Sequence, residues 1–374
     1  MFVVLRNSLF LDEEYNWFIK NSDLNFWIII LVFIVYLIII IVDFSYKIRL
    51  NFLFLALLYI IMLRDLLSFF LLYEIVFILI IFVIVLLGYS YERLIAAFLI
   101  IFYSFLFSRP VLILLLLFDN RFIIKNWMAY SIIVLYFLVG SFMVKFPIFG
   151  FHYWLPVAHV EASTIGSIVL AGVLLKLGSV GLVYVIIYMN FIVKFHWLSV
   201  GIVLLILMIL SLSDLKIIIA YSSVAHIRIV FFVLILGTNI GKKGAIYIIF
   251  YHGFISPLMF WVVGILVWWK TRSLLVVKII SFSYLFILCL FFMFILNIGF
   301  PPFIGFIREV LILKSVVGIK LVLWVLILGV LFRCYYNAYL FWCFTGFIGI
   351  VYKINFFFFD LFIFLLFVLC LNFY

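Results

Sequence analysis

The sequence is poor in charge, in paired cysteines and in polar surface residues, and each shortage excludes a class of protein. Only 10% of the 374 residues are charged, while 72% are hydrophobic, so a soluble domain could not cover its surface. The four cysteines (Cys289, Cys334, Cys343 and Cys370) lie apart in apolar segments without a CxxC pair. This spacing supports neither an iron–sulfur cluster nor a zinc site. We therefore predict an all-α polytopic membrane protein, one transmembrane domain over residues 1–374, without a soluble catalytic domain.

Two further biases concern location and partners. The net charge of +11 would suggest nucleic acid in a soluble protein. Here the lysines and arginines mostly mark loop ends, so lipid headgroups are the expected partner and no nucleic acid is expected. The fifty phenylalanines are typical of an AT-rich genome, such as an organellar one, as much as of any structural need.

Hydropathy predicts about thirteen transmembrane helices, because a span needs about 20 apolar residues. The loops between them are short, so no separate domain is expected. Two of the segments are short: residues 50–63 are interpreted as a partial span, and residues 303–317 as half of a broken helix. The predicted spans are 24–42, 50–63, 66–88, 94–117, 127–154, 163–188, 197–213, 215–236, 244–268, 279–299, 303–317, 319–344 and 354–372.

Pro147 and Pro156 interrupt one apolar run, with Gly150 between them. A proline lacks an N–H and clashes with the carbonyl four residues back. We therefore expect the carbonyls of Met143 and His152 to lose their helical partners. Such a break is tolerated in hydrocarbon only where protein or water satisfies the freed backbone groups.

A second break is predicted at Pro301 and Pro302, with Glu309 two turns beyond. Paired interruptions in the two halves of a chain mark inverted repeats with an ion path at their interface. We therefore predict two proline-broken helices, in segments 147–156 and 299–305, related by an inverted repeat.

Ionisable residues stand inside three of the predicted spans: Glu74, Lys145 and Lys176. A lysine at the bilayer centre costs about 2.5–3.5 kcal/mol on insertion scales, so intramembrane ionisable residues are functional candidates. The alternatives are a lysine that snorkels from a helix end and a protonated, hydrogen-bonded structural Glu74.

Two histidines extend this set. His226 lies four residues after Ser222, so both share one helix face, and His252 lies in a later span. Histidine is the natural proton relay near neutral pH, although a lone helical histidine is more often a satisfied core residue. A zinc site at His152, His159 and Glu161 is rejected, because the two histidines straddle Pro156 and lack the i, i+4 spacing of a helical zinc motif.

Three segments resemble a known family. The run KFPIFGFHYWLPVAHVEASTIGS, followed by VLLKLG, resembles the antiporter-like membrane subunits of NADH:ubiquinone oxidoreductase (respiratory complex I), and its AHVEA segment resembles subunit 4. The segment DLKIIIAYSSVAHIRI and the broken helix NIGFPPFIGFIREVL resemble the same family. The resemblance covers residues 66–345, interpreted as the antiporter-like proton-translocating core. Departures from the family pattern are Val157, Ser163, Arg228 and Arg308.

The resemblance implies a proton pump that couples electron transfer from NADH to quinone to proton translocation. It implies no cofactor or metal in this chain, with NADH, FMN, iron–sulfur clusters and quinone on other subunits of the respiratory chain enzyme. The implied partners are other membrane-arm subunits, including paralogous antiporter-like subunits, and the implied location is the mitochondrial inner membrane. The implied proton pathway comprises Glu74, Lys145, Lys176, His226, His252 and Glu309, supported by Lys216, Ser222, His159 and Glu161.

Two alternatives stay open. A subunit of a multisubunit sodium/proton antiporter or of a membrane-bound hydrogenase, also in a bacterial plasma membrane, would use the same residues with different partners. A non-pumping structural scaffold would be favoured by loss of an ionisable position, and all six are present. Arg228, unexpected beside His226, is predicted to face lipid headgroups or an acidic partner.

Overall fold

The computed structural model is helical throughout the part of the chain that it describes. That part comprises residues 17–42, 47–63, 66–88, 91–117, 132–148, 150–189, 197–268, 284–301, 303–318 and 320–345. Helices suit these apolar segments because a helix satisfies its backbone hydrogen bonds within itself, which hydrocarbon requires. The predicted all-α fold is therefore confirmed, while the predicted span 354–372 lies outside the described residues.

The helices follow the predicted spans closely at most positions. Two exceptions are an interrupted helix before Trp154 and a π-helical turn, η3, in the middle of one span. In chain order the elements are α2 (Trp17–Val42), α3 (Lys47–Met62), α4 (Leu66–Leu87), α5 (Arg93–Leu117), α6 (Ile132–Lys145), α7 (Trp154–Glu161), α8 (Thr164–Val169), η3 (Leu170–Leu174), α9 (Leu175–Met189), α10 (Trp197–Ser211), α11 (Leu215–Ile235), α12 (Asn239–Trp268), α14 (Tyr284–Ile298), α15 (Ile304–Val316) and α16 (Lys320–Thr345).

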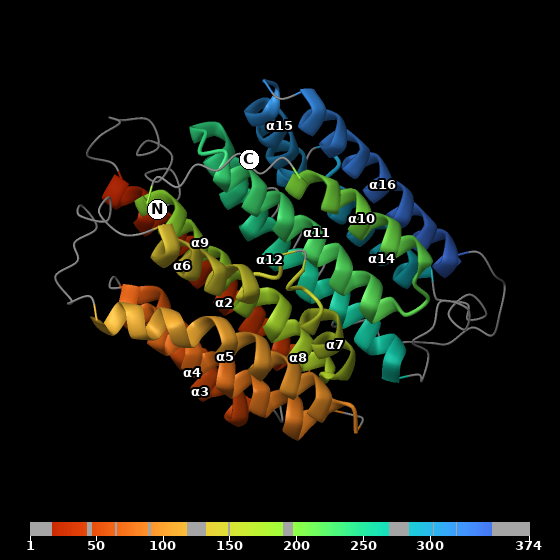
Figure 1. The fold of residues 1–374 in the computed structure, drawn as a ribbon. Helices are drawn as coiled ribbons and strands as arrows, with labels where there is room; N and C mark the ends of the chain where they lie inside the picture. The colour runs from red at the N-terminus through yellow and green to blue at the C-terminus, as the bar shows by residue number, and fades with distance from the viewer. Residues whose placement is uncertain are drawn as a thin grey trace.

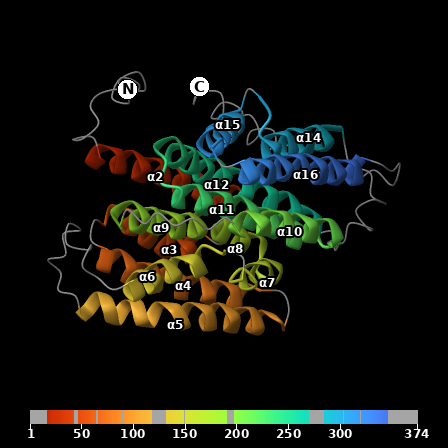
Figure 2. The same ribbon diagram turned by 45° about the horizontal axis from the view of Figure 1, so that its top comes forward.

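The helices run side by side, with α3, α4 and α5 on one flank and α14, α15 and α16 on the opposite flank (Figures 1 and 2). Between the flanks lie α11, α12 and the run from α8 through η3 to α9. Burial follows this arrangement: the apolar windows of Thr164–Val183 and Leu215–Ile235 are 100% and 94% buried, whereas that of Leu67–Leu87 is 33% buried. Polar residues on the central helices are therefore shielded by the flanking helices.

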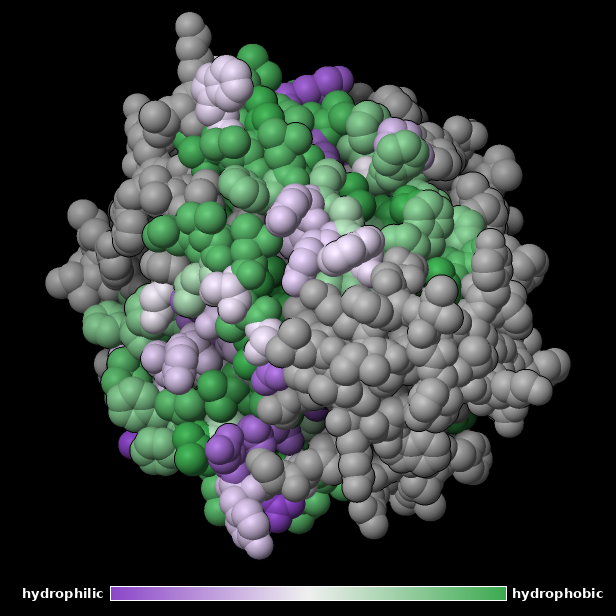
Figure 3. All heavy atoms as spheres, turned by 90° about the vertical axis from the view of Figure 1, so that its right-hand side faces the viewer, coloured by the Kyte–Doolittle hydropathy of each residue, from purple (hydrophilic) through white to green (hydrophobic). Residues whose placement is uncertain are grey.

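The outer faces are apolar. Phe52, Leu86 and Trp324 are 66%, 73% and 66% exposed, and hydrophobic side chains dominate the described surface of the face in Figure 3. Within the described ranges, six helices are long and apolar enough to cross a membrane. Such faces require lipid or neighbouring membrane helices rather than water.

The first predicted break is present at Pro147. Helix α6 ends at Lys145, and the chain turns through Gly150, whose φ of 100° favours glycine, before α7 begins. The Met143 carbonyl keeps a partner, because the Ile148 N–H donates to it over 3.2 Å. The freed backbone group is thus satisfied within the protein.

Pro156 does not break a helix, and that prediction is wrong. It is the third residue of α7, where the backbone N–H has no intrahelical partner and a proline fits. The His152 carbonyl also keeps a partner, since the Leu155 N–H donates to it over 3.1 Å.

The second break separates α14 from α15. Helix α14 ends at Ile298, Gly299 takes a φ of 84°, and α15 begins at Ile304 after a turn that contains Pro301. Pro302 lies outside the described residues. The two interrupted helices therefore exist, and each brings a lysine or a glutamate to the interior: Lys145 at the end of α6 and Glu309 in the second turn of α15.

Close helix packing at Gly181 is a constraint that we predict to be measurable. A Cβ on Gly181 of α9 would overlap the ring of Phe142 from α6, which is fully buried. Gly181→Ala should therefore destabilise the chain by about 1–3 kcal/mol and lower its thermal unfolding midpoint in detergent. The control is Gly318→Ala, since a Cβ there meets nothing within 4 Å. Equal midpoints for the two variants would show that the α6–α9 packing is looser than described.

Candidate functional site

The first charged pair joins α4 to the end of α6. The Lys145 ammonium donates to Glu74 Oε1, and the Lys145 side chain is 1% exposed while that of Glu74 is 20% exposed. The ammonium also lies 4.5 Å and 4.4 Å from the ring centroids of Phe70 and Tyr73. The carboxylate and the ring faces together stabilise a cation in a region from which water is excluded.

Tyr73 connects this pair to the next helix. Its hydroxyl donates to the Leu174 carbonyl over 3.4 Å, at the last residue of η3. Gly178 makes the approach possible, because a Cβ there would lie 2.8 Å from the Tyr73 hydroxyl and 3.5 Å from the Lys145 carbonyl. The surroundings of Lys145 thus extend directly to the π-helical turn.

The π-helical turn supplies a hydrogen-bond acceptor for the second buried lysine. Lys176, 2% exposed, donates from its Nζ to the Ala171 carbonyl over 2.8 Å. The Ser256 hydroxyl of α12 lies 3.4 Å from the same carbonyl and makes its shorter hydrogen bond, 2.8 Å, to the His252 carbonyl. π-Turns shift the backbone register locally and recur at functional sites, and here the shift places a carbonyl beside the ammonium.

Lys176 also contacts one of the two predicted histidines, His252, which in turn lies beside the other. Its Nζ lies 2.8 Å from Nδ1 of His252, and the rings of His252 and His226 lie 5.1 Å apart between centroids. A charged ammonium has no lone pair, so His252 Nδ1 accepts the hydrogen bond while Lys176 is charged. Nε2 of His226 is buried and has no hydrogen-bond partner among the described residues.

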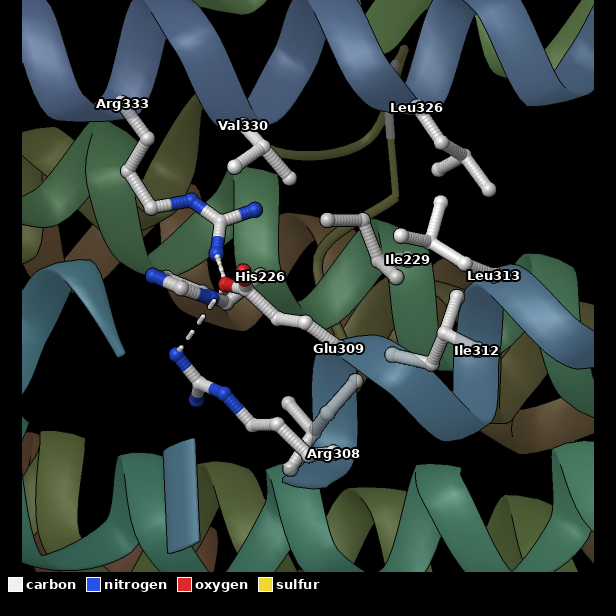
Figure 4. A pocket seen from close by; sticks show the side chains of 10 residues that line it. His226, Ile229, Arg308, Glu309, Ile312, Leu313, Leu326, Val330 and Arg333 are labelled. Carbon is white, nitrogen blue, oxygen red and sulfur yellow. Dashed lines mark hydrogen bonds and ion pairs between the residues drawn. The ribbon is translucent and has the colours of Figure 1, made fainter. Parts of the chain in front are cut away.

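His226 faces the last group of charges (Figure 4). It lines a small cavity of about 20 Å³ together with Arg308 and Glu309 of α15 and Arg333 of α16. Arg333 donates to Glu309 Oε1, and Nη2 of Arg308 lies 3.9 Å from the same oxygen. Buried and half-buried ionisable groups therefore form three neighbouring sets: Glu74 with Lys145, Lys176 with the two histidines, and Glu309 with its arginines.

Comparison with known proteins identifies the family. A family model described as NADH:quinone oxidoreductase/Mrp antiporter, transmembrane, matches residues 64–333. The chain belongs to this family. Relatives named NADH-ubiquinone oxidoreductase chain 4 are 32% identical in Ascaris suum, over 68% of this chain and 64% of the relative, and 36% identical in Aedes aegypti, over 67% and 59%. The chain thus spans less than two thirds of the length of these relatives.

Solved structures of this antiporter-like family share the fold. Respiratory complex I from Thermus thermophilus contains a chain with a TM-score of 0.77 and 20% identity, covering 93% of this chain and 80% of that one. The Mrp complex from Dietzia also gives a TM-score of 0.77, at 15% identity, covering 86% and 66%. Both of these solved structures are complexes, and at this level of identity the similarity shows a shared fold.

The residues predicted to support the pathway lie in the interior and contact their neighbours as follows. Lys216 of α11, 2% exposed, donates to the carbonyls of Val160 and Ala162 over 3.2 Å and 2.9 Å, which caps the carboxyl end of α7. His159 is fully buried and stacks on Phe260 with centroids 4.3 Å apart. Glu161, the last residue of α7, is buried, and Ser222 donates to the Ile219 carbonyl over 2.7 Å.

Arg228 is buried, so the expectation that it faces lipid headgroups is wrong. Its side chain is 1% exposed, and its guanidinium group occupies the space beside Gly201 of α10 where a Cβ would stand. The other part of that expectation, an acidic partner, stays a prediction. Hydropathy could not have placed this residue, because a helix buried on all sides has no outward polar face.

Sequence reasoning also missed a polar cluster on α16. Arg333, Tyr336 and Asn337 lie at i, i+3 and i+4 and so share a face. The Asn297 amide at the end of α14 donates to Asn337 Oδ1 over 2.9 Å and to the Tyr336 hydroxyl over 3.3 Å. The Tyr336 hydroxyl also interacts with Ser222 of α11. The signal in the sequence was this i, i+3, i+4 set inside an apolar helix.

No group of three or more histidine, cysteine, aspartate or glutamate side chains that could hold a metal ion occurs in the described ranges. The described chemistry of the site consists of ionisable side chains, hydroxyls and freed carbonyls. Of these groups, the lysine, histidine and glutamate side chains can bind and release a proton, while the carbonyls accept hydrogen bonds.

We predict that the Tyr336 hydroxyl stabilises the junction of α11, α14 and α16. Tyr336→Phe removes the buried hydroxyl that accepts from the Asn297 amide, so the free energy of unfolding should fall by about 1–2 kcal/mol. Tyr335→Phe is the matched control, because Tyr335 is 59% exposed. Thermal unfolding in detergent would measure both variants. If they unfold at the same temperature, the hydroxyl contributes no stability.

Proposed function

We propose that this chain is a proton-pumping membrane subunit of NADH:ubiquinone oxidoreductase. The observation that supports the proposal best is the set of ionisable groups in the interior, from the Glu74–Lys145 pair through Lys176 and the two histidines to Glu309. Intramembrane ionisable residues in such a series mark proton relays. The printed names of the relatives, chain 4 of this enzyme, favour the same assignment.

The proposed mechanism begins at the Glu74–Lys145 pair. A neighbouring carboxylate favours the charged lysine, and separation of the two groups favours release of the proton from the desolvated ammonium. Movement at the α6–α7 break, next to Lys145, would change that separation. The pair thus acts as a switch that loads and unloads Lys145.

The second stage is proton transfer from Lys176 to the histidines. Lys176 Nζ is 2.8 Å from His252 Nδ1, so a proton can pass between the two nitrogens along an existing hydrogen bond. When Lys176 loses its proton, the Ala171 carbonyl continues to orient the amine through a remaining N–H. His226 is the next titratable ring, 5.1 Å from His252.

The remaining assignments belong to the same proposal. The core over 66–345, about thirteen spans and an inverted repeat would place the two broken helices at the ends of the path. The chain would reside in the mitochondrial inner membrane with lipids and the other membrane-arm subunits, including its paralogues. NADH, FMN, the iron–sulfur clusters and quinone would be held by other subunits.

A subunit of an Mrp-type sodium/proton antiporter is the second candidate. It is favoured by the family description and by the similarity to the Dietzia Mrp complex. The same lysines and histidines would then exchange protons for a cation without electron transfer.

Lys176→Arg tests the relay. Arginine keeps the positive charge but does not release its proton in proteins. We expect the assembled enzyme that carries Lys176→Arg to lose this subunit's whole share of the protons pumped per electron. Lys314→Arg on α15 is the control, because Lys314 is exposed. Assembly is checked separately. A wild-type proton-to-electron ratio in the assembled Lys176→Arg enzyme would show that Lys176 contributes only a fixed positive charge and does not carry a proton.

Copurification tests the choice of complex. With broad apolar faces exposed on its flanks, the chain should be recovered after mild detergent extraction only within a large complex. We expect NADH-reactive subunits to be present in that complex, as identified by mass spectrometry and NADH oxidation. Copurification with antiporter subunits alone would favour the Mrp-type candidate, and a stable, active single chain would contradict both.

A further inference from the structure

The ion pairs of Glu309 differ chemically from the ion pair of Glu74. Glu74 has one cationic partner, Lys145, which can release its proton. Glu309 has two guanidinium neighbours, Arg308 and Arg333, and neither of these releases a proton. The two ends of the series therefore respond differently to protonation of their carboxylates.

Arg308 is fixed in position by further contacts, and Arg333 reaches the same carboxylate from another helix. Arg308 is 1% exposed, donates from Nε to the Gly305 carbonyl over 3.2 Å and lies 4.5 Å above the ring of Tyr251. Tyr251 in turn donates to the Leu296 carbonyl over 2.5 Å. The Arg333 side chain is 9% exposed and comes from a different helix, α16. Two independent elements thus direct guanidinium groups at one carboxylate oxygen.

Protonation of Glu309 would leave two buried guanidinium groups without an anion, which is strongly unfavourable. The other titratable groups near this site are His226 of α11, Tyr251 and His252 of α12, and Cys334 and Tyr336 of α16. None of these supplies a negative charge in its neutral form. Glu309 is therefore the counter-ion of the described cluster.

We propose that Arg308 and Arg333 hold Glu309 as a permanent anion, so that Glu309 closes the series as a fixed counter-ion and does not itself carry a proton. The three groups form an ion triad with a net charge of +1. A protonated His226 across the cavity (Figure 4) is repelled by that charge, so the triad disfavours entry of protons from this end. Arg308 and Arg333 are positioning residues in this scheme.

A proton that leaves His226 then has another set of groups within reach. Ser222 lies one turn before His226 on the same face, and its neighbour Tyr336 is hydrogen-bonded to Asn297. Hydroxyl groups both donate and accept. The path past the triad therefore uses neutral side chains. This assignment rests on the proposed proton-pumping function, whereas the charge state of Glu309 does not.

A charge-balance experiment in the assembled complex tests the triad. Glu309→Gln raises the net charge of the site to +2 and should abolish pumping or assembly. The double variant Glu309→Gln with Arg333→Gln returns the net charge to +1 and should recover at least half of the wild-type proton-to-electron ratio. Arg109→Gln is the control, because this exposed arginine lies over Phe105 on α5. An assembled double variant as inactive as Glu309→Gln would overturn the proposal.

Infrared difference spectroscopy of the complex provides a readout that needs no pumping. Spectra of oxidised and reduced enzyme at several near-neutral pH values report protonated carboxyl groups through their C=O stretching bands. We expect Glu309→Asp to leave these bands unchanged. A band that moves in Glu309→Asp would show that Glu309 takes up a proton and would overturn the proposal. If the wild-type complex does not pump, this measurement still decides the charge state of Glu309.

Discussion

The centre of this protein depends on one constraint: a buried ammonium group must find its hydrogen-bond acceptors in the protein itself, because water does not reach it. Lys176 meets that constraint with the Ala171 carbonyl and His252 Nδ1. The carbonyl is placed by the π-helical turn η3, and the imidazole by α12, so two helices are fixed relative to each other by one cation. Because neither partner is an anion, the charge on Lys176 is stabilised only in part, which is consistent with the proton release proposed for it.

The cations at the two ends of the series differ in how strongly their charge depends on the surroundings. Lys145 is surrounded by Phe70 and Tyr73 and by a single carboxylate, Glu74, so its charge depends on one distance between two helices. The guanidinium groups beside Glu309 keep their charge whatever that distance is. Both ends of the series contain an ion pair. In the scheme proposed above, a lysine makes one pair switchable, and arginines make the other permanent.

The sequence predicted the residues of the series better than their surroundings. Intramembrane charge is conspicuous in an apolar chain, so Glu74, Lys145 and Lys176 could be selected from hydropathy and from the resemblance of their segments to a known family. The π-turn could not be predicted, because its hydrogen bonds shift by one residue within an uninterrupted apolar run. Pro156 was misjudged because proline also fits a first helical turn, and Arg333 was missed because hydropathy does not distinguish its inward face from an end of a span.

The N-terminal helix α2 lies outside the matched family region of 64–333, yet it covers the central lysine. Leu31 of α2 occupies the space at Gly253 where a Cβ would stand, and Lys176 Cε lies 3.4 Å from that point. Val35, one turn later, fills the corresponding space at Gly172 of η3. These aliphatic side chains cover the Lys176–His252 hydrogen bond on the side of α2, and in the proposed relay they would keep water away from the transferring proton.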